Sequence, residues 1–204
     1  MLAILAISVT VFAACNNSAN QTSEKKDTMN RDHMALDSGK TNSGETMNAP
    51  VIKASFTNVS SDVAGHINEL VSHYFHIGHA LTKDDAVEAK NGATMMLQVV
   101  SRFDNSLLPA DQKPEYSQHI NAIRQDADAI VKSADVETAR KHFAELSEHT
   151  YELAKAFGAG KKVYYDHCPM AFNGKGANWL NDVAAIQNPY MGSKMPECGS
   201  VKQV

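Results

Sequence analysis

The chain has 204 residues, of which 43% are hydrophobic and 21% are charged, and its formal net charge is −4. A chain of this size and composition can bury one hydrophobic core. The slightly acidic balance argues against nucleic acid as a partner, because a phosphate backbone is bound by a basic surface. The chain holds nine His and nine Met but only three Cys and one Trp. His and Met both ligate soft or borderline metals, so the composition favours metal binding as a function to test.

The beginning of the chain predicts export. Residues 1–14 form an apolar run that is too short to span a bilayer and that ends in small residues directly before Cys15. The order Phe-Ala-Ala-Cys resembles the lipobox of bacterial lipoproteins, which implies that Cys15 carries a lipid anchor in the mature protein. We therefore expect residues 1–15 to be a signal peptide with a lipobox-like cysteine. The protein is then expected to be periplasmic and anchored to the membrane.

Residues 16–58 are rich in Asn, Ser, Thr, Lys and Asp and lack apolar periodicity, so we predict a flexible polar tether. The rest of the chain, residues 59–204, is expected to hold a helical domain and a C-terminal motif.

From residue 62 onward, apolar residues recur at alternating spacings of three and four, which is the pattern of amphipathic helices. Asp84 or Asp85 is a candidate N-cap of the second helix, Asp135 caps the fourth and Gly158 ends it. Short connections force neighbouring helices to run antiparallel, so we expect an all-α fold, an up-down-up-down four-helix bundle with an irregular Cys/Met-rich C-terminal tail. The four predicted helical segments are residues 63–81, 86–107, 116–134 and 136–157.

The tail begins after Gly160, where the helical periodicity stops. Val163 and Tyr165 alternate like a short strand, and Asn173-Gly174 is a turn signal. Residues 178–186 are predicted to form a short helix.

Soft metal ligands gather on both sides of that turn. Two thiolates with thioethers nearby select Cu(I) over Mg, Ca or Mn, and Ag or Zn would bind the same thiolates. The absence of a C-x-x-C spacing excludes a zinc ribbon and a thioredoxin motif. The alternative is a Cys168–Cys198 disulfide, which would close a loop of about thirty residues and contribute roughly 3–4 kcal/mol, with the methionines serving as packing. The candidate metal ligands are His167, Cys168, Met170, Met191, Met195 and Cys198.

Two stretches of the tail carry a family resemblance. The runs H-C-P-M-A-F-N-G-K-G-A-N-W-L and I-Q-N-P-Y-M-G-S-K-M-P-E-C-G-S-V resemble the terminal signature of the bacterial family called domain of unknown function 3347. The four helices, including the segment at 142–147, also fit that family, so the resemblance covers about residues 60–202. Members of the family occur as exported proteins or lipoproteins. They also occur as domains appended to periplasmic adaptors of copper and silver efflux systems.

The C-P-M triplet is also similar to the Y-x-C-P-M motif of small heavy-metal-binding domains found in such adaptors. The resemblance therefore implies soft-metal ligation by Cys168, Met170, Met195 and Cys198, with Met191 as a weaker ligand. It also implies a periplasmic efflux adaptor as a partner.

A second group of candidate ligands lies on the first predicted helix. His66, Glu69, His73 and His76 fall within about 80° of one another on a helical wheel, beside the apolar stripe. Imidazoles at these spacings can share a Cu, Zn or Ni ion, and the alternative is a solvated face that titrates with pH. The other helical histidines are predicted to lie on the surface: His119, His142 and His149.

Enzyme signatures are missing from the sequence. It contains no G-x-S-x-G, H-E-x-x-H, Gly-rich phosphate loop or C-x-x-C-H motif. We expect a non-enzymatic copper or silver binding protein that acts as a buffer or as a donor to an efflux adaptor. The alternative function is a protein-interaction module without metal, stapled by a Cys168–Cys198 disulfide.

Overall fold

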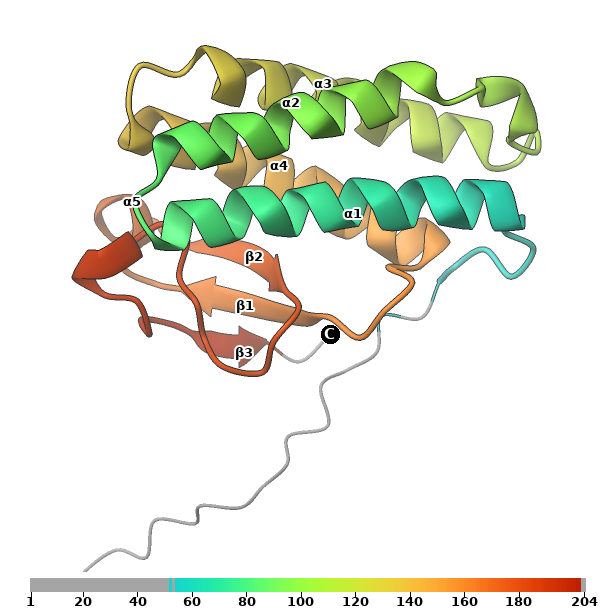
Figure 1. Cartoon of the computed structure of the whole chain (residues 1–204). Coiled ribbons are helices and arrows are strands. Elements are labelled where there is room, and N and C mark those ends of the chain that lie inside the picture. The colour runs from blue at the N-terminus through green and yellow to red at the C-terminus, as the bar shows by residue number, and fades with distance from the viewer. Residues whose placement is uncertain (1–51, 53, 203–204) are drawn as a thin grey trace, which may run out of the picture. The chain divides into compact units, whose positions relative to one another are not determined.

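The structure is a computed structural model, and it describes residue 52 and residues 54–202 (Figure 1). The predicted signal peptide, the lipidation of Cys15 and most of the predicted tether fall outside these residues. The account below concerns the compact unit within Thr46–Val204. Among the described residues, no helix has both the length and the apolar character needed to cross a membrane.

Four long helices make up most of this unit. Side chains before three of them accept hydrogen bonds from the first turn, which satisfies backbone donors that a helix start leaves unpaired. These caps are Ser60 before α1, Asp85 before α2 and Asp135 before α4. The four predicted helical segments are therefore confirmed, with the bounds α1 Ser61–Thr82, α2 Ala86–Arg102, α3 Lys113–Lys132 and α4 Val136–Phe157.

The second helix ends earlier than its apolar pattern predicts. The pattern runs to Leu107, but α2 stops at Arg102 and Phe103 is extended. The Phe103 ring stacks on His66 of α1 at a centroid distance of 3.9 Å. Asp104 then caps a short 3-10 turn, Asn105–Leu107, by accepting a hydrogen bond from its backbone. Phe103 thus packs on α1 instead of continuing α2, where spacing alone would extend the helix.

The predicted apolar stripes form the core. Helix α1 packs against α2 and α4, α2 packs against α3, and α3 packs against α4 (Figure 1). Large side chains from all four helices are almost fully buried there, among them Ile67, Leu70, Tyr74, Met96, Ile123, Phe143 and Leu146.

The all-α prediction is wrong for the C-terminal region, which forms a small antiparallel sheet in the order β2-β1-β3. The strands are β1 Tyr164–Cys168, β2 Ala177–Asn181 and β3 Ser200–Lys202. The predicted strand near residue 165 is confirmed as β1, and the predicted turn at Asn173-Gly174 lies in the short element α5, Ala171–Gly174. The predicted helix at 178–186 is wrong, because its first half pairs with β1 as a strand.

Tyrosine side chains join the sheet to the helices. The Tyr74 hydroxyl of α1 accepts a hydrogen bond from the Leu180 N–H of β2 at 3.0 Å and lies 2.8 Å from the Ser147 hydroxyl of α4. Tyr151 of α4 stacks on Tyr165 of β1 at a centroid distance of 4.1 Å. The sheet is therefore held against α1 and α4 by defined contacts.

Candidate functional site at the C-terminal sheet

Two cysteine thiols meet at the end of the central strand of the sheet. Cys168 ends β1 and is fully buried, whereas Cys198 lies half-buried just before β3. Their Sγ atoms are 3.1 Å apart although the residues are 30 positions apart in sequence, and both cysteines are free. A disulfide bond would hold the sulfurs at about 2.05 Å. The structure therefore brings together the two sulfurs that both sequence hypotheses require.

A buried asparagine shapes the loop that carries Cys198. The side-chain amide of Asn188 donates to the Cys198 carbonyl, and its Oδ1 accepts from the N–H groups of Tyr190 and Met191 at 2.8 and 3.0 Å. The backbone N–H of Asn188 donates to the Pro196 carbonyl at 2.8 Å. One side chain thus ties the two ends of the loop together, which places Cys198 beside β1.

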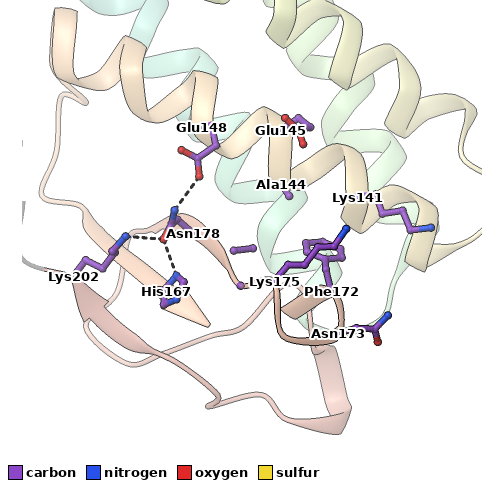
Figure 2. Close-up of a pocket in the computed structure, with 12 residues that line it drawn as sticks. Lys141, Ala144, Glu145, Glu148, His167, Phe172, Asn173, Lys175, Asn178 and Lys202 are labelled. Atoms are coloured by element: carbon purple, nitrogen blue, oxygen red, sulfur yellow. Dashed lines mark hydrogen bonds between the residues drawn. The ribbon is translucent and has the colours of Figure 1, made fainter. Parts of the chain in front are cut away.

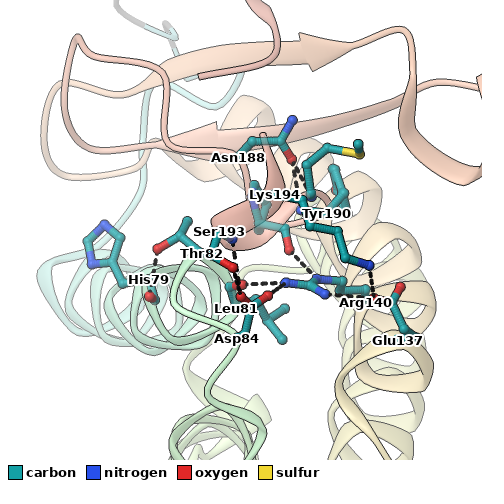
Figure 3. A network of polar contacts seen from close by, with 12 residues as sticks. His79, Leu81, Thr82, Asp84, Glu137, Arg140, Asn188, Tyr190, Ser193 and Lys194 are labelled. Atoms are coloured by element: carbon teal, nitrogen blue, oxygen red, sulfur yellow. Dashed lines mark hydrogen bonds and ion pairs between the residues drawn. The ribbon is translucent and has the colours of Figure 1, made fainter. Parts of the chain in front are cut away.

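A buried arginine fastens the same loop to the helices (Figure 3). Arg140 of α4 is 2% exposed; its Nε donates to the Pro189 carbonyl and its Nη2 to the Leu81 carbonyl, each at 2.8 Å. Nη2 also pairs with Asp84 Oδ1. Asp84 Oδ2 accepts a hydrogen bond from the Ser193 N–H at 3.2 Å. Hydrogen bonds from Ser193 and Arg140 lower the pKa of Asp84 to about 2. The Cys198 loop is therefore anchored to α4 and to the turn after α1.

Cys168 affects the ionisation of Cys198. The hydrogen bond with Cys168, together with burial, raises the pKa of Cys198. A raised thiol pKa means that Cys198 is protonated at neutral pH. Because the thiolate is the form that ligates metal, an ion that binds here must displace that proton.

The predicted thioether ligands flank the thiols in sequence. Met170 lies two positions after Cys168 and is 52% exposed, and Met195 is 37% exposed. The Met195 carbonyl accepts a hydrogen bond from the Cys198 N–H at 3.2 Å, so these two residues share one tight turn. Met191 is half-buried and packs against the core. Methionine side chains have three rotatable bonds, which lets the exposed pair adapt to a ligand.

His167 does not join the thiols. Successive side chains of a strand point to opposite faces, so His167 and Cys168 face away from each other on β1. His167 instead lines a groove of about 620 Å³ between α4 and the sheet (Figure 2). A groove of this volume is in the range that accommodates small molecules.

A polar network crosses that groove (Figure 2). The side-chain amide of Asn178 donates to Glu148 at 3.0 Å, and its Oδ1 lies 2.8 Å from His167 Nδ1 and 3.2 Å from Lys202 Nζ. Since an amide oxygen only accepts, His167 carries its proton on Nδ1, and in the neutral ring Nε2 keeps its lone pair. Phe172 adds an aromatic wall to the groove.

The histidines of α1 do not form one site. His66 is 7% exposed, with its Nε2 atom 2.7 Å from the Tyr116 hydroxyl, and burial lowers its pKa to about 4. The expectation that it flanks the apolar stripe on a solvated face is therefore wrong, because Phe103 and Tyr116 cover it. His76 pairs with Glu88 at 2.5 Å, and burial lowers the pKa of half-buried His73.

Within the described part of the chain, no three His, Cys, Asp or Glu side chains gather in a way that could hold a metal ion. The thiol pair therefore offers two of these ligands and would need thioethers or water to complete a coordination shell.

Sequence reasoning missed the two residues that position the thiols. Asn188 precedes Pro189, and Asn-Pro favours turn initiation, so that signal was present. Arg140 sits beside Ala139 of the apolar stripe, but no pattern in the sequence distinguishes it from an exposed helical arginine.

Comparison with known proteins gives one match. Residues 70–162 match the family described as Protein of unknown function (DUF3347). No curated protein and no solved structure matches the chain. The matched range runs from α1 to the end of α4 and stops before β1. The family expected from the sequence is thus confirmed for the helices, while Cys168 and Cys198 lie beyond the matched residues.

Proposed function

We propose that this chain, which over residues 70–162 belongs to the family of domain of unknown function 3347, binds a soft metal ion between Cys168 and Cys198. The observation that carries the proposal is the 3.1 Å approach of two free sulfurs, one buried in a strand and one half-exposed on a loop. Soft thiolates favour Cu(I), and Ag(I) or Zn²⁺ are the competing ions.

The sulfurs need only a small movement to hold an ion. Thiolates that each lie about 2.3 Å from one metal are about 3.5 to 4.6 Å apart for S–metal–S angles from about 100° to 180°. From 3.1 Å, the sulfurs would separate by roughly 0.4 to 1.5 Å. Cys168 is fixed in β1, so the half-exposed Cys198 loop makes that movement.

Exposed side chains near the thiols could supply further metal ligands and allow the metal to be passed to a partner. Met170 and Met195 are partly exposed and lie near the two cysteines in sequence, so we propose that their flexible side chains complete the coordination shell. The exposed side of Cys198 gives a partner access to the metal. We therefore propose a buffer, or a donor to a periplasmic efflux adaptor.

The proposed setting rests on the sequence. The apolar run before Cys15 supports export and a lipid anchor in the periplasm. We also take the four helices to run in up-down-up-down order, as their short connections favour.

The competing function uses the same two sulfurs. Thiols at 3.1 Å are close enough for an oxidant to join them, and the disulfide would then staple a module that binds protein and no metal. The raised pKa of Cys198 slows that oxidation at neutral pH and equally opposes metal binding, because the thiolate is the reactive form in both cases. The presence of free thiols at this distance, and not their ionisation, is what supports the metal proposal.

Titration of the reduced protein with Cu(I) against a competing chelator tests the proposal. We expect tight binding that is lost in Cys168→Ser/Cys198→Ser, and that strengthens about tenfold per pH unit for each proton displaced. Met170→Leu/Met195→Leu should weaken binding. Met95→Leu, which changes an exposed methionine on α2, is the matched control and should not.

Equal Cu(I) affinity in the parent and the double-cysteine variant would overturn the proposal. A mass measurement on the exported protein adds a second check. A mass two hydrogens below that of the dithiol, resistant to mild reductants, would establish the stapled module instead.

A further inference from the structure

Two histidines from different helices meet at the seam between α3 and α4. His119 of α3 is 6% exposed, and His149 of α4 is half-buried. Their Nδ1 atoms are 3.3 Å apart, with ring centroids 5.6 Å apart and ring planes at 47°. The expectation that both are separate surface histidines is therefore wrong for His119, because α4 covers it.

A carboxylate orients the buried ring. Glu115 Oε1 lies 3.2 Å from His119 Nε2, and Glu115 is one helical turn earlier on α3. Since a carboxylate only accepts hydrogen bonds, Nε2 carries the proton and the neutral ring presents a bare Nδ1 towards His149. Metal-binding histidines are commonly held in this way, with a carboxylate on the distal nitrogen.

We propose that His119 and His149 bind one divalent metal ion of the zinc class through their Nδ1 atoms. Zinc–nitrogen bonds are about 2.0–2.1 Å long, so two nitrogens 3.3 Å apart would subtend about 104–111° at the ion. That range includes the tetrahedral angle that Zn²⁺ prefers. Neutral imidazole is a ligand that suits Zn²⁺.

The site is open on one side. No third His, Cys, Asp or Glu completes it among residues 52 and 54–202, so water or a group from a partner would fill the remaining positions. Half-buried His149 leaves a route for the ion from solvent.

Binding requires a change of tautomer and a small rotation of the rings. In the free pair, His149 donates its Nδ1 proton to the bare Nδ1 of His119. When the ion enters, His149 moves that proton to Nε2 and both Nδ1 lone pairs face the metal. The change uses neutral rings, the form of imidazole that ligates a metal.

Calorimetric titration of the full chain with Zn²⁺ tests the inference. The titration uses the Cys168→Ser/Cys198→Ser background, so that thiolates contribute nothing and the outcome is independent of the proposed Cu(I) site. We expect about one Zn²⁺ per chain and at least tenfold weaker binding in His149→Ala. Glu115→Gln should weaken binding by about 10- to 100-fold.

His142→Ala is the matched control, because it removes another α4 histidine and should leave the affinity unchanged. Nitrogen-15 spectra should show Zn²⁺-dependent shifts at Nδ1 of both rings. Unchanged affinity in His149→Ala and Glu115→Gln, or shifts confined to Nε2, would overturn the inference. Glu115 is partly exposed, so its variant keeps the test valid if His149→Ala is misfolded.

Discussion

Acid should act on the stability of this protein through two buried groups with opposite signs. Burial lowers the pKa of His66 from 6.5 to about 4, so the folded protein resists a proton that the unfolded chain accepts. The contribution of His66 is therefore present above pH 6.5 and is lost as the pH falls through 4. Burial raises the pKa of Asp166 from 3.8 to about 6, so its contribution is present below 3.8 and is lost as the pH rises through 6.

The two contributions are similar in size and span similar pH windows. One pKa unit corresponds to about 1.4 kcal/mol, so each shift of two to two and a half units is worth about 3 kcal/mol. Both side chains are less than a tenth exposed, so solvent screens these effects little. Between pH 4 and 6.5 the two effects on the free energy of unfolding nearly cancel in the parent protein.

Urea unfolding at pH 4, 5, 6 and 7 at constant ionic strength separates them. From pH 7 to pH 4, His66→Gln should gain about 3 kcal/mol relative to the parent, because it no longer loses stability in acid. Asp166→Asn should lose about 3 kcal/mol relative to the parent over the same range. His142→Gln is the control for removing a half-buried histidine. Parallel pH profiles for all four proteins would refute the burial argument.

Three further changes test the contacts that position the sheet and the Cys198 loop. Arg140→Met breaks the buried arginine network and should lower the free energy of unfolding by about 3–5 kcal/mol. The same change at exposed Arg124 should lower it little. Equal losses of the two variants in urea unfolding would contradict this. Tyr74→Phe leaves a buried backbone N–H of β2 unpaired, so it should cost about 1–3 kcal/mol in the same assay. Gly160→Ala should cost about 2–4 kcal/mol, because its Cβ would lie 1.6 Å from a side-chain oxygen at a φ of 67°. Gly174→Ala has a φ of 83° but meets no atom within 4 Å, so its thermal unfolding should shift less.

The helices were predictable because their signals are local. Alternating apolar spacings lie within each helix, and the candidate caps directly precede it. Of the candidates Asp84 or Asp85 and Asp135, the structure uses Asp85 and Asp135. The end of α2 was not predictable from spacing, since Phe103 leaves the helix and stacks against His66 of another helix. Spacing shows which residues can share a face, but contacts between elements determine where a helix stops.

Contacts between elements also decide the structure of the sheet, which local spacing did not predict. Residues 178–186 carry a short apolar run that fits either a helix or a strand, and pairing with β1 decides the outcome. The approach of Cys168 to Cys198 was expected, because both a disulfide and a metal site require it. The separation of His167 from that pair follows from strand alternation, which became visible only when β1 was known to reach Cys168.

The geometry of the thiol pair depends on the helices. Cys168 is placed by β1, which β2 links to Tyr74 and Ser147, whereas Cys198 is placed by a loop that Arg140 fastens to α4. Neither anchor uses a sulfur, so the folded helices bring the thiols together before any ion or oxidant arrives. Preorganisation of this kind reduces the cost of ordering two ligands when a metal binds. It also explains how two residues outside the matched family range depend on helices inside it.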